Sequence, residues 1–129
     1  FNLIYRHTAI ENVQMPLQYS DTLDKKERNK KALECLEMVD LSNRAKHHPN
    51  ELSGGQQQRV AIARSLINNP DIILADEPTG NLDSKTSADI IDLLKKLHDS
   101  GKTIIIITHD ESIAKEAMDT IRIKDGRII

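Results

Sequence analysis

Cysteine and aromatic residues are almost absent from this sequence of 129 residues, which holds one Cys, no Trp, one Phe and two Tyr. The lone Cys35 cannot form an internal disulfide, so we expect a small buried thiol and a reducing compartment. Long apolar runs are missing too, because none approaches the roughly 20 residues of a membrane-crossing helix. These absences argue against a disulfide-built secreted module and a membrane span, and they predict a soluble chain with one hydrophobic core.

Positive charge is not in excess, because 18 Lys and Arg stand against 20 Asp and Glu, a formal net charge of -2. Proteins that bind the phosphate backbone of nucleic acids need Lys and Arg to neutralise it. The balance of charge therefore predicts no nucleic-acid partner.

A complete phosphate-binding loop is also missing, although Gly101-Lys102-Thr103 resembles the end of one. The motif needs a further Gly five residues before Gly101, where Lys96 stands. It also needs a strand before it and a helix after it, whereas here a predicted helix precedes the triplet and a predicted strand follows. We interpret Gly101 as an ordinary C-terminal helix cap.

Hydrophobic periodicity predicts that residues 1–70 are mainly helical. Thr8 begins a Thr-x-x-Glu capping box and therefore a short helix. Residues 24–39 form an amphipathic pattern that places Leu33 on the buried face. A further amphipathic helix is predicted over residues 57–68, after a loop.

Residues 71–129 predict an α/β pattern. The expected elements follow one another as strand 72–75, helix 84–98, strand 103–107 and a small helix at 112–118. Short continuous apolar strands joined by an amphipathic helix are typical of a parallel sheet covered on both faces. Asp125-Gly126 predicts a hairpin turn near the end.

The stretch around Ser53, Gly54, Gly55 and Gln56 is a candidate anion site. Two glycines let a ligand approach the backbone, the serine adds a hydroxyl, and the following helix points its positive end here. A helix N-terminus typically favours a negative charge by only about 0.3–1 kcal/mol. The site therefore needs a second surface, and a glycine-rich helix entry without a ligand is the alternative for this stretch by itself.

Two carboxylates, Asp76 and Glu77, follow the first predicted strand, at the edge where open parallel sheets bind ligands. We expect Asp76 to face Mg²⁺ and Glu77 to polarise an attacking water, because buried adjacent acids need a cation or a proton. The crossover brings His109 to the same edge, where its imidazole can hydrogen-bond a phosphate oxygen. For Asp83, which precedes the next helix, a capping role remains the alternative to a functional one.

The other four histidines have no such setting, and we interpret them as surface residues: His7, His47, His48 and His98.

Taken in order, residues 52–56, 72–77, 81–83 and His109 resemble the signature motif, the Walker B strand with its catalytic glutamate, the D-loop and the switch histidine of ABC-transporter ATPases. The resemblance implies an α/β fold, with a partial P-loop NTPase-like parallel sheet and an N-terminal helical subdomain. Residues 1–70 would be the helical subdomain and signature helix, and residues 71–129 the partial RecA-like core.

The same resemblance implies ATP and Mg²⁺ as cofactors. Glu77 and His109 would be catalytic and Asp76 would bind the metal. Asp83, in the D-loop, would be a further cofactor-binding residue. The signature residues would contact the ATP of a partner subunit, and they are Ser53, Gly54, Gly55 and Gln56.

The implied partners are a second ATPase subunit in a head-to-tail dimer and a transmembrane permease, with Leu17 and Tyr19 as candidate permease contacts. The protein would be cytoplasmic and peripheral on the inner face of the cell membrane. The wording of residues 75–84 and of residues 11–13 further resembles the subfamily of lipoprotein-release, macrolide-export and antimicrobial-peptide-resistance ATPases.

The family's phosphate-binding loop and Q-loop glutamine would precede residue 1, so we expect the C-terminal part of an ATPase that turns over no ATP alone. Such a piece would carry an unpaired strand edge that invites a second copy. A non-catalytic binding fragment is one alternative. A chromosome-type ABC ATPase is another, which the short helix before Leu52 disfavours.

Overall fold

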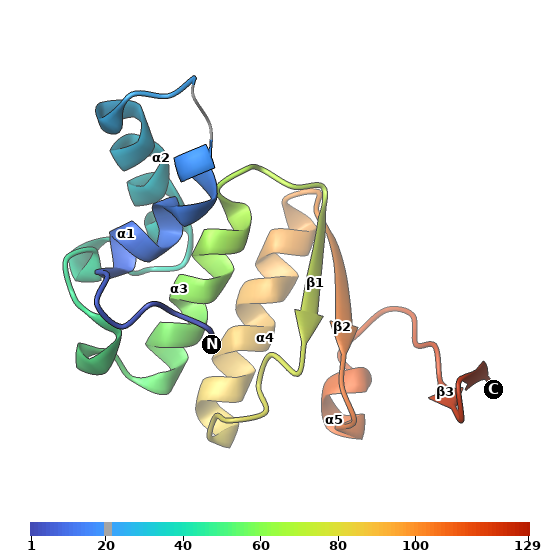
Figure 1. Cartoon of the computed structure of the whole chain (residues 1–129). Coiled ribbons are helices and arrows are strands. Elements are labelled where there is room, and N and C mark those ends of the chain that lie inside the picture. The colour runs from blue at the N-terminus through green and yellow to red at the C-terminus, as the bar shows by residue number, and fades with distance from the viewer. Residues whose placement is uncertain (20–21) are drawn as a thin grey trace.

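A computed structural model of the chain describes residues 1–19 and 22–129. Figure 1 shows a cluster of helices built from the first half of the chain, beside a long helix and two parallel strands from the second half. The first half runs, in chain order, through α1 (Ala9–Gln14), η1 (Met15–Tyr19), α2 (Lys25–Met38), η2 (Ser42–Arg44), η3 (Pro49–Glu51) and α3 (Gly54–Leu66). The second half runs through β1 (Ile72–Asp76), α4 (Ser84–Asp99), β2 (Thr103–Ile107), α5 (Glu111–Ala114), β3 (Ile123–Lys124) and β4 (Arg127–Ile128). The α/β class predicted from the sequence is confirmed.

Side-chain caps set the starts of the helices. Thr8 N donates to Glu11 Oε2 at 2.8 Å, and Glu11 N donates back to Thr8 Oγ1, which confirms the predicted capping box. Ser53 and Gln56 form the same reciprocal pair at the start of α3. Because this box closes around Ser53, α3 begins at Gly54, three residues earlier than predicted.

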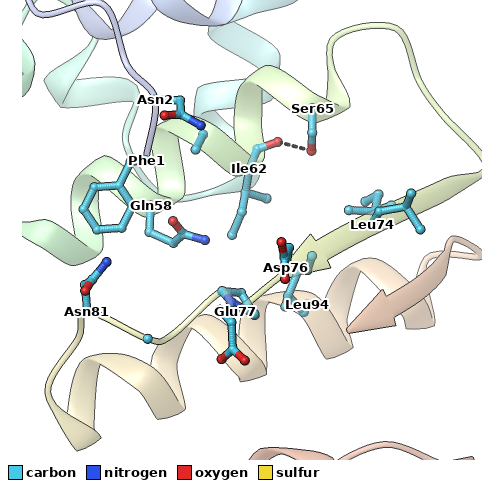
Figure 2. Close-up of a pocket in the computed structure, with 15 residues that line it drawn as sticks. Phe1, Asn2, Gln58, Ile62, Ser65, Leu74, Asp76, Glu77, Asn81 and Leu94 are labelled. Carbon is cyan, nitrogen blue, oxygen red and sulfur yellow. Dashed lines mark hydrogen bonds between the residues drawn. The ribbon is translucent and has the colours of Figure 1, made fainter. Parts of the chain in front are cut away.

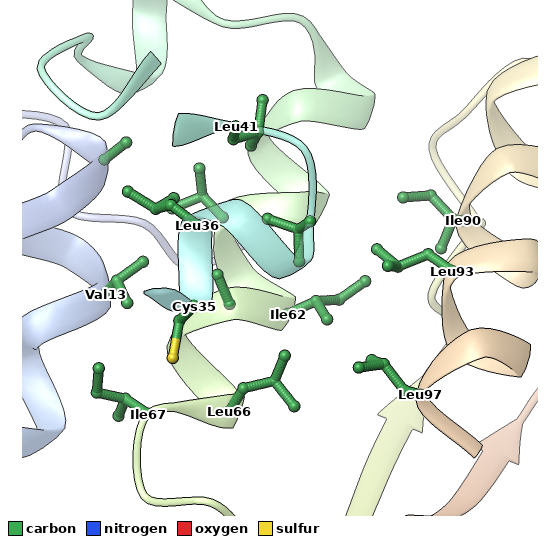
Figure 3. Packing of buried hydrophobic residues seen from close by; sticks show 14 of the residues in the cluster. Val13, Cys35, Leu36, Leu41, Ile62, Leu66, Ile67, Ile90, Leu93 and Leu97 are labelled. Atoms are coloured by element: carbon green, nitrogen blue, oxygen red, sulfur yellow. The ribbon is translucent and has the colours of Figure 1, made fainter. Parts of the chain in front are cut away.

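The helices pack around one buried cluster (Figure 3). Val13 of α1, Leu36 of α2 and Val60 of α3 are fully buried. Cys35 is buried among them as predicted, and burial raises the pKa of its thiol. Leu33 was predicted on the same face of α2, but it is 42% exposed, because the buried stripe of that helix is narrower than its apolar pattern.

The sheet is parallel, as predicted, with Ile72 opposite Thr103 and Asp76 opposite Ile107. Its inward side chains, Ile73 foremost, pack on the core. The other face carries four exposed apolar side chains: Ile72, Leu74, Ile105 and Ile107. The expected cover on both faces is therefore wrong for the described residues, because the helices of this chain pack against one face only.

The turns follow local chemistry. Gly101 has a φ of 99° directly after the C-cap of α4, which confirms the predicted helix cap. Lys102 belongs to the Gly-Lys-Thr triplet that resembles a phosphate-binding loop. Its Nζ donates to Asn69 Oδ1 and Pro70 O at 2.9 Å each, which links the start of β2 to the loop before β1. Asp125 and Gly126 both have positive φ and close the predicted hairpin. The small helix α5 is shorter than expected.

Within the described residues no helix is both long and apolar enough to span a membrane.

Candidate functional site

The loops that follow β1 and β2 meet at one edge of the sheet. Glu77 N donates to Ile107 O at 2.8 Å, so the ladder continues one residue past β1. Glu77 then has a φ of 44°, in the left-handed region that a side chain other than glycine rarely adopts. This backbone turn is part of what directs the Glu77 side chain toward the residues after β2.

Three donors converge on the Glu77 carboxylate. Oε1 accepts from His109 Nδ1 at 2.7 Å and from His109 N at 2.9 Å, and Oε2 accepts from Thr108 Oγ1 at 3.3 Å. An ionised carboxylate only accepts, so Nδ1 carries the proton and Nε2 of a neutral ring is left as an acceptor. The hydrogen bond from the His109 side chain is the main cause that lowers the pKa of Glu77. The predicted placement of His109 beside the acids is confirmed for Glu77.

Asp76 stands apart from this pair. Its side chain is exposed and makes no hydrogen bond or ion pair within residues 1–19 and 22–129. Figure 2 shows Asp76 and Glu77 pointing to different sides of the chain. The expectation that both acids are buried is wrong, because the strand ends at an open edge and 36% of the Glu77 side chain is exposed.

Two hollows flank the end of β1. One, of about 440 Å³, is lined by Asp76 together with Gln58 of α3 and Asn81. The other, of about 560 Å³, is lined by His109. Glu77 and Gly80 line both, so the hollows meet at the turn after β1.

This edge suits a magnesium ion held largely by phosphates. The described residues contain no cluster of three or more His, Cys, Asp or Glu that could enclose a metal. Mg²⁺ is usually bound through one or two carboxylates, waters and substrate phosphates, and does not need an all-protein cage. The single free carboxylate of Asp76 fits that mode.

The start of α3 is held by a capping box and by packing on α4, and its role as an anion site stays a prediction. Ser53 and Gln56 are engaged with each other in the capping box. Gly55 is buried, and a Cβ added there would lie 2.3 Å from Thr86 Cγ2 of α4. This glycine therefore permits the close packing of α3 on α4, a role that was not predicted from the sequence. Gly54 is half-buried, and a Cβ added there would lie 3.3 Å from Leu82 Cδ2.

Asp83 is the N-cap of α4. Its Oδ1 accepts from Lys85 N and Thr86 N at 3.1 Å each, and its Oδ2 accepts from Thr86 Oγ1 at 2.6 Å. The Thr86 side chain is the main cause that lowers the pKa of Asp83. The capping alternative is thus present in the structure, and a role toward nucleotide stays a prediction.

The exposure of several residues differs from the prediction. His98 is exposed as predicted, but three histidines are half-buried because the loops of the helical half fold over them: His7, His47 and His48. Leu17 is only 3% exposed, so it offers no surface to a permease, whereas Tyr19 is 92% exposed.

Thr108 is a site residue that the sequence analysis did not single out. Its hydroxyl donates to Glu77 and accepts from Asp110 N at 3.0 Å, which links the carboxylate to the cap of α5. The sequence feature that could have indicated this contact is a hydroxyl side chain directly before the histidine that follows β2.

Comparison with known proteins agrees with this fold. The family model of the ABC transporter matches residues 1–80. An uncharacterized ABC transporter ATP-binding protein of Methanocaldococcus jannaschii, MJ0796, is 57% identical over 99% of this chain and 56% of its own length. One of Thermotoga maritima is 54% identical over 99% of the chain and 54% of its own length. The macrolide export ATP-binding/permease protein MacB of Bdellovibrio bacteriovorus is 55% identical over 99% of the chain and 19% of its own.

A solved structure shares the fold. The dimeric post-hydrolysis structure of the ATP-binding cassette MJ0796 bound to ADP and Pi superposes with a TM-score of 0.80 at 53% identity, over 98% of this chain and 56% of that one. The fold is that of an ABC ATPase cassette. The chain belongs to the ABC transporter family, and it spans about half the length of the first two relatives.

Proposed function

We propose that this chain is the C-terminal part of the ATP-hydrolysing subunit of an ABC transporter. The observation that carries the proposal is the Glu77–His109 pair at 2.7 Å, at the edge of a parallel sheet and next to the free carboxylate of Asp76. Hydrolysis of ATP needs a general base, a group that hydrogen-bonds the transferred phosphate and a ligand for the metal ion. These three residues supply one of each.

The roles follow from the hydrogen bonds. Glu77 Oε1 is occupied by two donors from His109, so Oε2, with one long contact to Thr108, is the oxygen that takes a proton from water. The water oxygen then bonds to the γ-phosphorus while the bond to the leaving ADP oxygen breaks. His109, 87% exposed, directs its free Nε2 edge at the phosphate and, when protonated, donates to it. Asp76 would hold Mg²⁺, which neutralises phosphate charge when bound.

In this proposal the start of α3 acts in the ATP site of a second subunit. A helix N-terminus with an exposed Ser53 favours phosphate only weakly. It becomes effective when it closes over ATP that a second subunit holds, in a head-to-tail dimer. That MJ0796 forms a dimer bound to ADP and Pi supports this arrangement. A permease is the further partner, as the ATP-binding/permease name of the MacB relatives suggests, and it would hold the protein at the inner face of the membrane.

ATP turnover tests the proposal and separates it from a non-catalytic binding fragment. The 129-residue chain, which contains no phosphate-binding loop, is expected to hydrolyse no ATP. Joined behind the N-terminal part of the Methanocaldococcus relative, it is expected to hydrolyse ATP, and Glu77→Gln is expected to lower turnover by roughly 10²–10⁴-fold. Glu111→Gln, at an exposed site on α5, is the matched control. Equal turnover in the Glu77→Gln and control proteins would remove Glu77 as the base.

A further inference from the structure

The charge of this chain is unevenly distributed. Although the chain has a net charge of -2, the first two turns of α2 hold five cations and one anion. The cations are Lys25, Lys26, Arg28, Lys30 and Lys31. Four of them, the lysines, are exposed, and Arg28 is half-buried. We call this segment, residues 25–31, the basic turn.

No acid in the described residues forms an ion pair with the basic turn. None of its five cationic side chains makes an ion pair or a side-chain hydrogen bond within residues 1–19 and 22–129. Its one acid, Glu27, accepts from Asp24 N at 2.9 Å and so serves the helix cap. The positive charges therefore remain available to a partner.

Helix stability explains only some of these residues. Glu27 stands one turn before Lys31, and Glu34 one turn after Lys30, where opposite charges attract. Lys25 and Lys26 have no acid one turn further along, Lys26 faces Lys30, and cations near a helix N-terminus oppose the helix dipole. These first-turn lysines therefore point to an external anion.

Two exposed apolar side chains belong to the same part of the chain. Leu33 follows Lys30 by three residues, on the same exposed face of α2, and is 42% exposed. Tyr19, shortly before α2, is 92% exposed. Figure 1 shows α2 at the far end of the molecule from the loops after β1 and β2. This surface is thus separate from the edge of the sheet that carries Glu77 and His109.

We propose that the basic turn, with Leu33 and Tyr19, binds the surface of a bilayer that contains anionic phospholipids. Lysines on long stems reach headgroup phosphates while a leucine and a tyrosine enter the boundary between headgroups and acyl chains. A nucleic acid would also use the cations, but a bilayer in addition buries Leu33 among its acyl chains. The proposal relies on the proposed function only for the nearness of a membrane, and it requires no nucleotide, so its test is independent of ATP turnover.

Vesicle sedimentation of the 129-residue chain tests the proposal. The chain is expected to sediment with vesicles of phosphatidylcholine containing about 30% phosphatidylglycerol, not with phosphatidylcholine alone, and to be released by about 0.5 M salt. K25Q/K26Q/K30Q/K31Q is expected to lower binding by roughly tenfold or more. The matched control removes four other exposed lysines, as K46Q/K96Q/K115Q/K124Q, and is expected to stay within about twofold.

A second variant distinguishes a bilayer from other polyanions. Y19S/L33Q keeps every charge and is expected to weaken vesicle binding several-fold while binding of a single-stranded RNA stays unchanged. Circular dichroism verifies that each variant is folded. Equal loss in the two lysine variants, binding to phosphatidylcholine alone, tighter binding to the RNA than to the vesicles, or no effect of Y19S/L33Q would each overturn the proposal.

Discussion

His109 Nδ1 lies 2.7 Å from Glu77 Oε1, and the His109 amide lies 2.9 Å from the same oxygen. The two residues follow different strands and are 32 positions apart in the chain. Parallel pairing of β1 and β2 brings them to one edge, and the left-handed backbone of Glu77 is compatible with the contact. The proposed base and the residue proposed to contact the phosphate are therefore joined directly by hydrogen bonds.

Removing the imidazole should alter the acid–base behaviour of Glu77. In His109→Ala we expect the pKa of Glu77 to rise toward its ordinary value of 4.5, because the hydrogen bond from the histidine side chain is the main cause that lowers it. Carbon-13 NMR of the Glu77 side-chain carboxyl during an acid titration measures this. His98→Ala, which removes another exposed histidine, should leave the Glu77 titration unchanged.

The sign of the accompanying stability change follows from linkage. A carboxylate whose pKa is lowered on folding contributes stability above its unfolded pKa and loses it as the pH falls through the folded one. The difference in unfolding free energy between the parent and His109→Ala should therefore shrink below pH 4.5. A difference that grew as the pH fell below 4.5 would contradict the hydrogen bond.

Gly55 should be required for packing in the absence of nucleotide. In Gly55→Ala the new methyl would meet Thr86 Cγ2 at 2.3 Å, so we expect a loss of about 1–3 kcal/mol in unfolding free energy. Gly54→Ala, which meets the flexible end of Leu82 at 3.3 Å and Phe1 Cζ at an ordinary contact distance of 3.9 Å, should lose less. Urea denaturation of the chain without ATP measures both.

A double-mutant cycle identifies the clash. Thr86→Ser removes the methyl and keeps the hydroxyl that bonds Asp83, so Gly55→Ala should cost less in that background. If Gly55→Ala costs as much in the Thr86→Ser background as in the parent chain, the contact between α3 and α4 does not explain this glycine.

Asn12 should be a major contributor to stability. It is fully buried; its Oδ1 accepts from Ile4 N, and its Nδ2 donates to backbone oxygens of Ile4, His7 and Thr8. Asn12→Ala removes the hydrogen bonds of Ile4 N and His7 O, whereas Ile4 O and Thr8 O keep backbone donors, for an expected loss of about 1–3 kcal/mol. Thermal and urea denaturation should show no comparable change for Asn43→Ala, at an exposed position. Similar values for the two variants would contradict the role of Asn12.

The open face of the sheet should promote self-association. Leu74 is 71% exposed at its centre, and exposed apolar faces drive association. We expect sedimentation to show species heavier than the monomer at about 100 μM, and Leu74→Lys to reduce them. Met118→Lys, at another exposed apolar residue away from the sheet, is the control. A monomeric parent chain would contradict this prediction.

Local chemistry accounts for what could be predicted of the fold. The cap at Thr8, the β-branched strand 103–107 and the turn at Asp125-Gly126 depend on neighbouring residues and are found where expected. The exposure of Leu33 and the burial of Leu17 could not be predicted, because each depends on which other helix packs against the residue. The site divides in the same way: the acids and the histidine were found by motif, and the contact with Thr108 was not.

By itself the sequence predicted the main helices, the parallel pairing of β1 with β2, and the placement of Asp76, Glu77 and His109 at one edge. The elements follow from periodicity and capping, which act over a few residues, and the placement follows from the crossover between parallel strands. Only the tertiary structure decided that Glu77 accepts from His109 while Asp76 stays free, and that Gly55 serves the packing of α3 on α4. Contacts between side chains from different elements depend on the distances set by the packed core, and no local pattern specifies those distances.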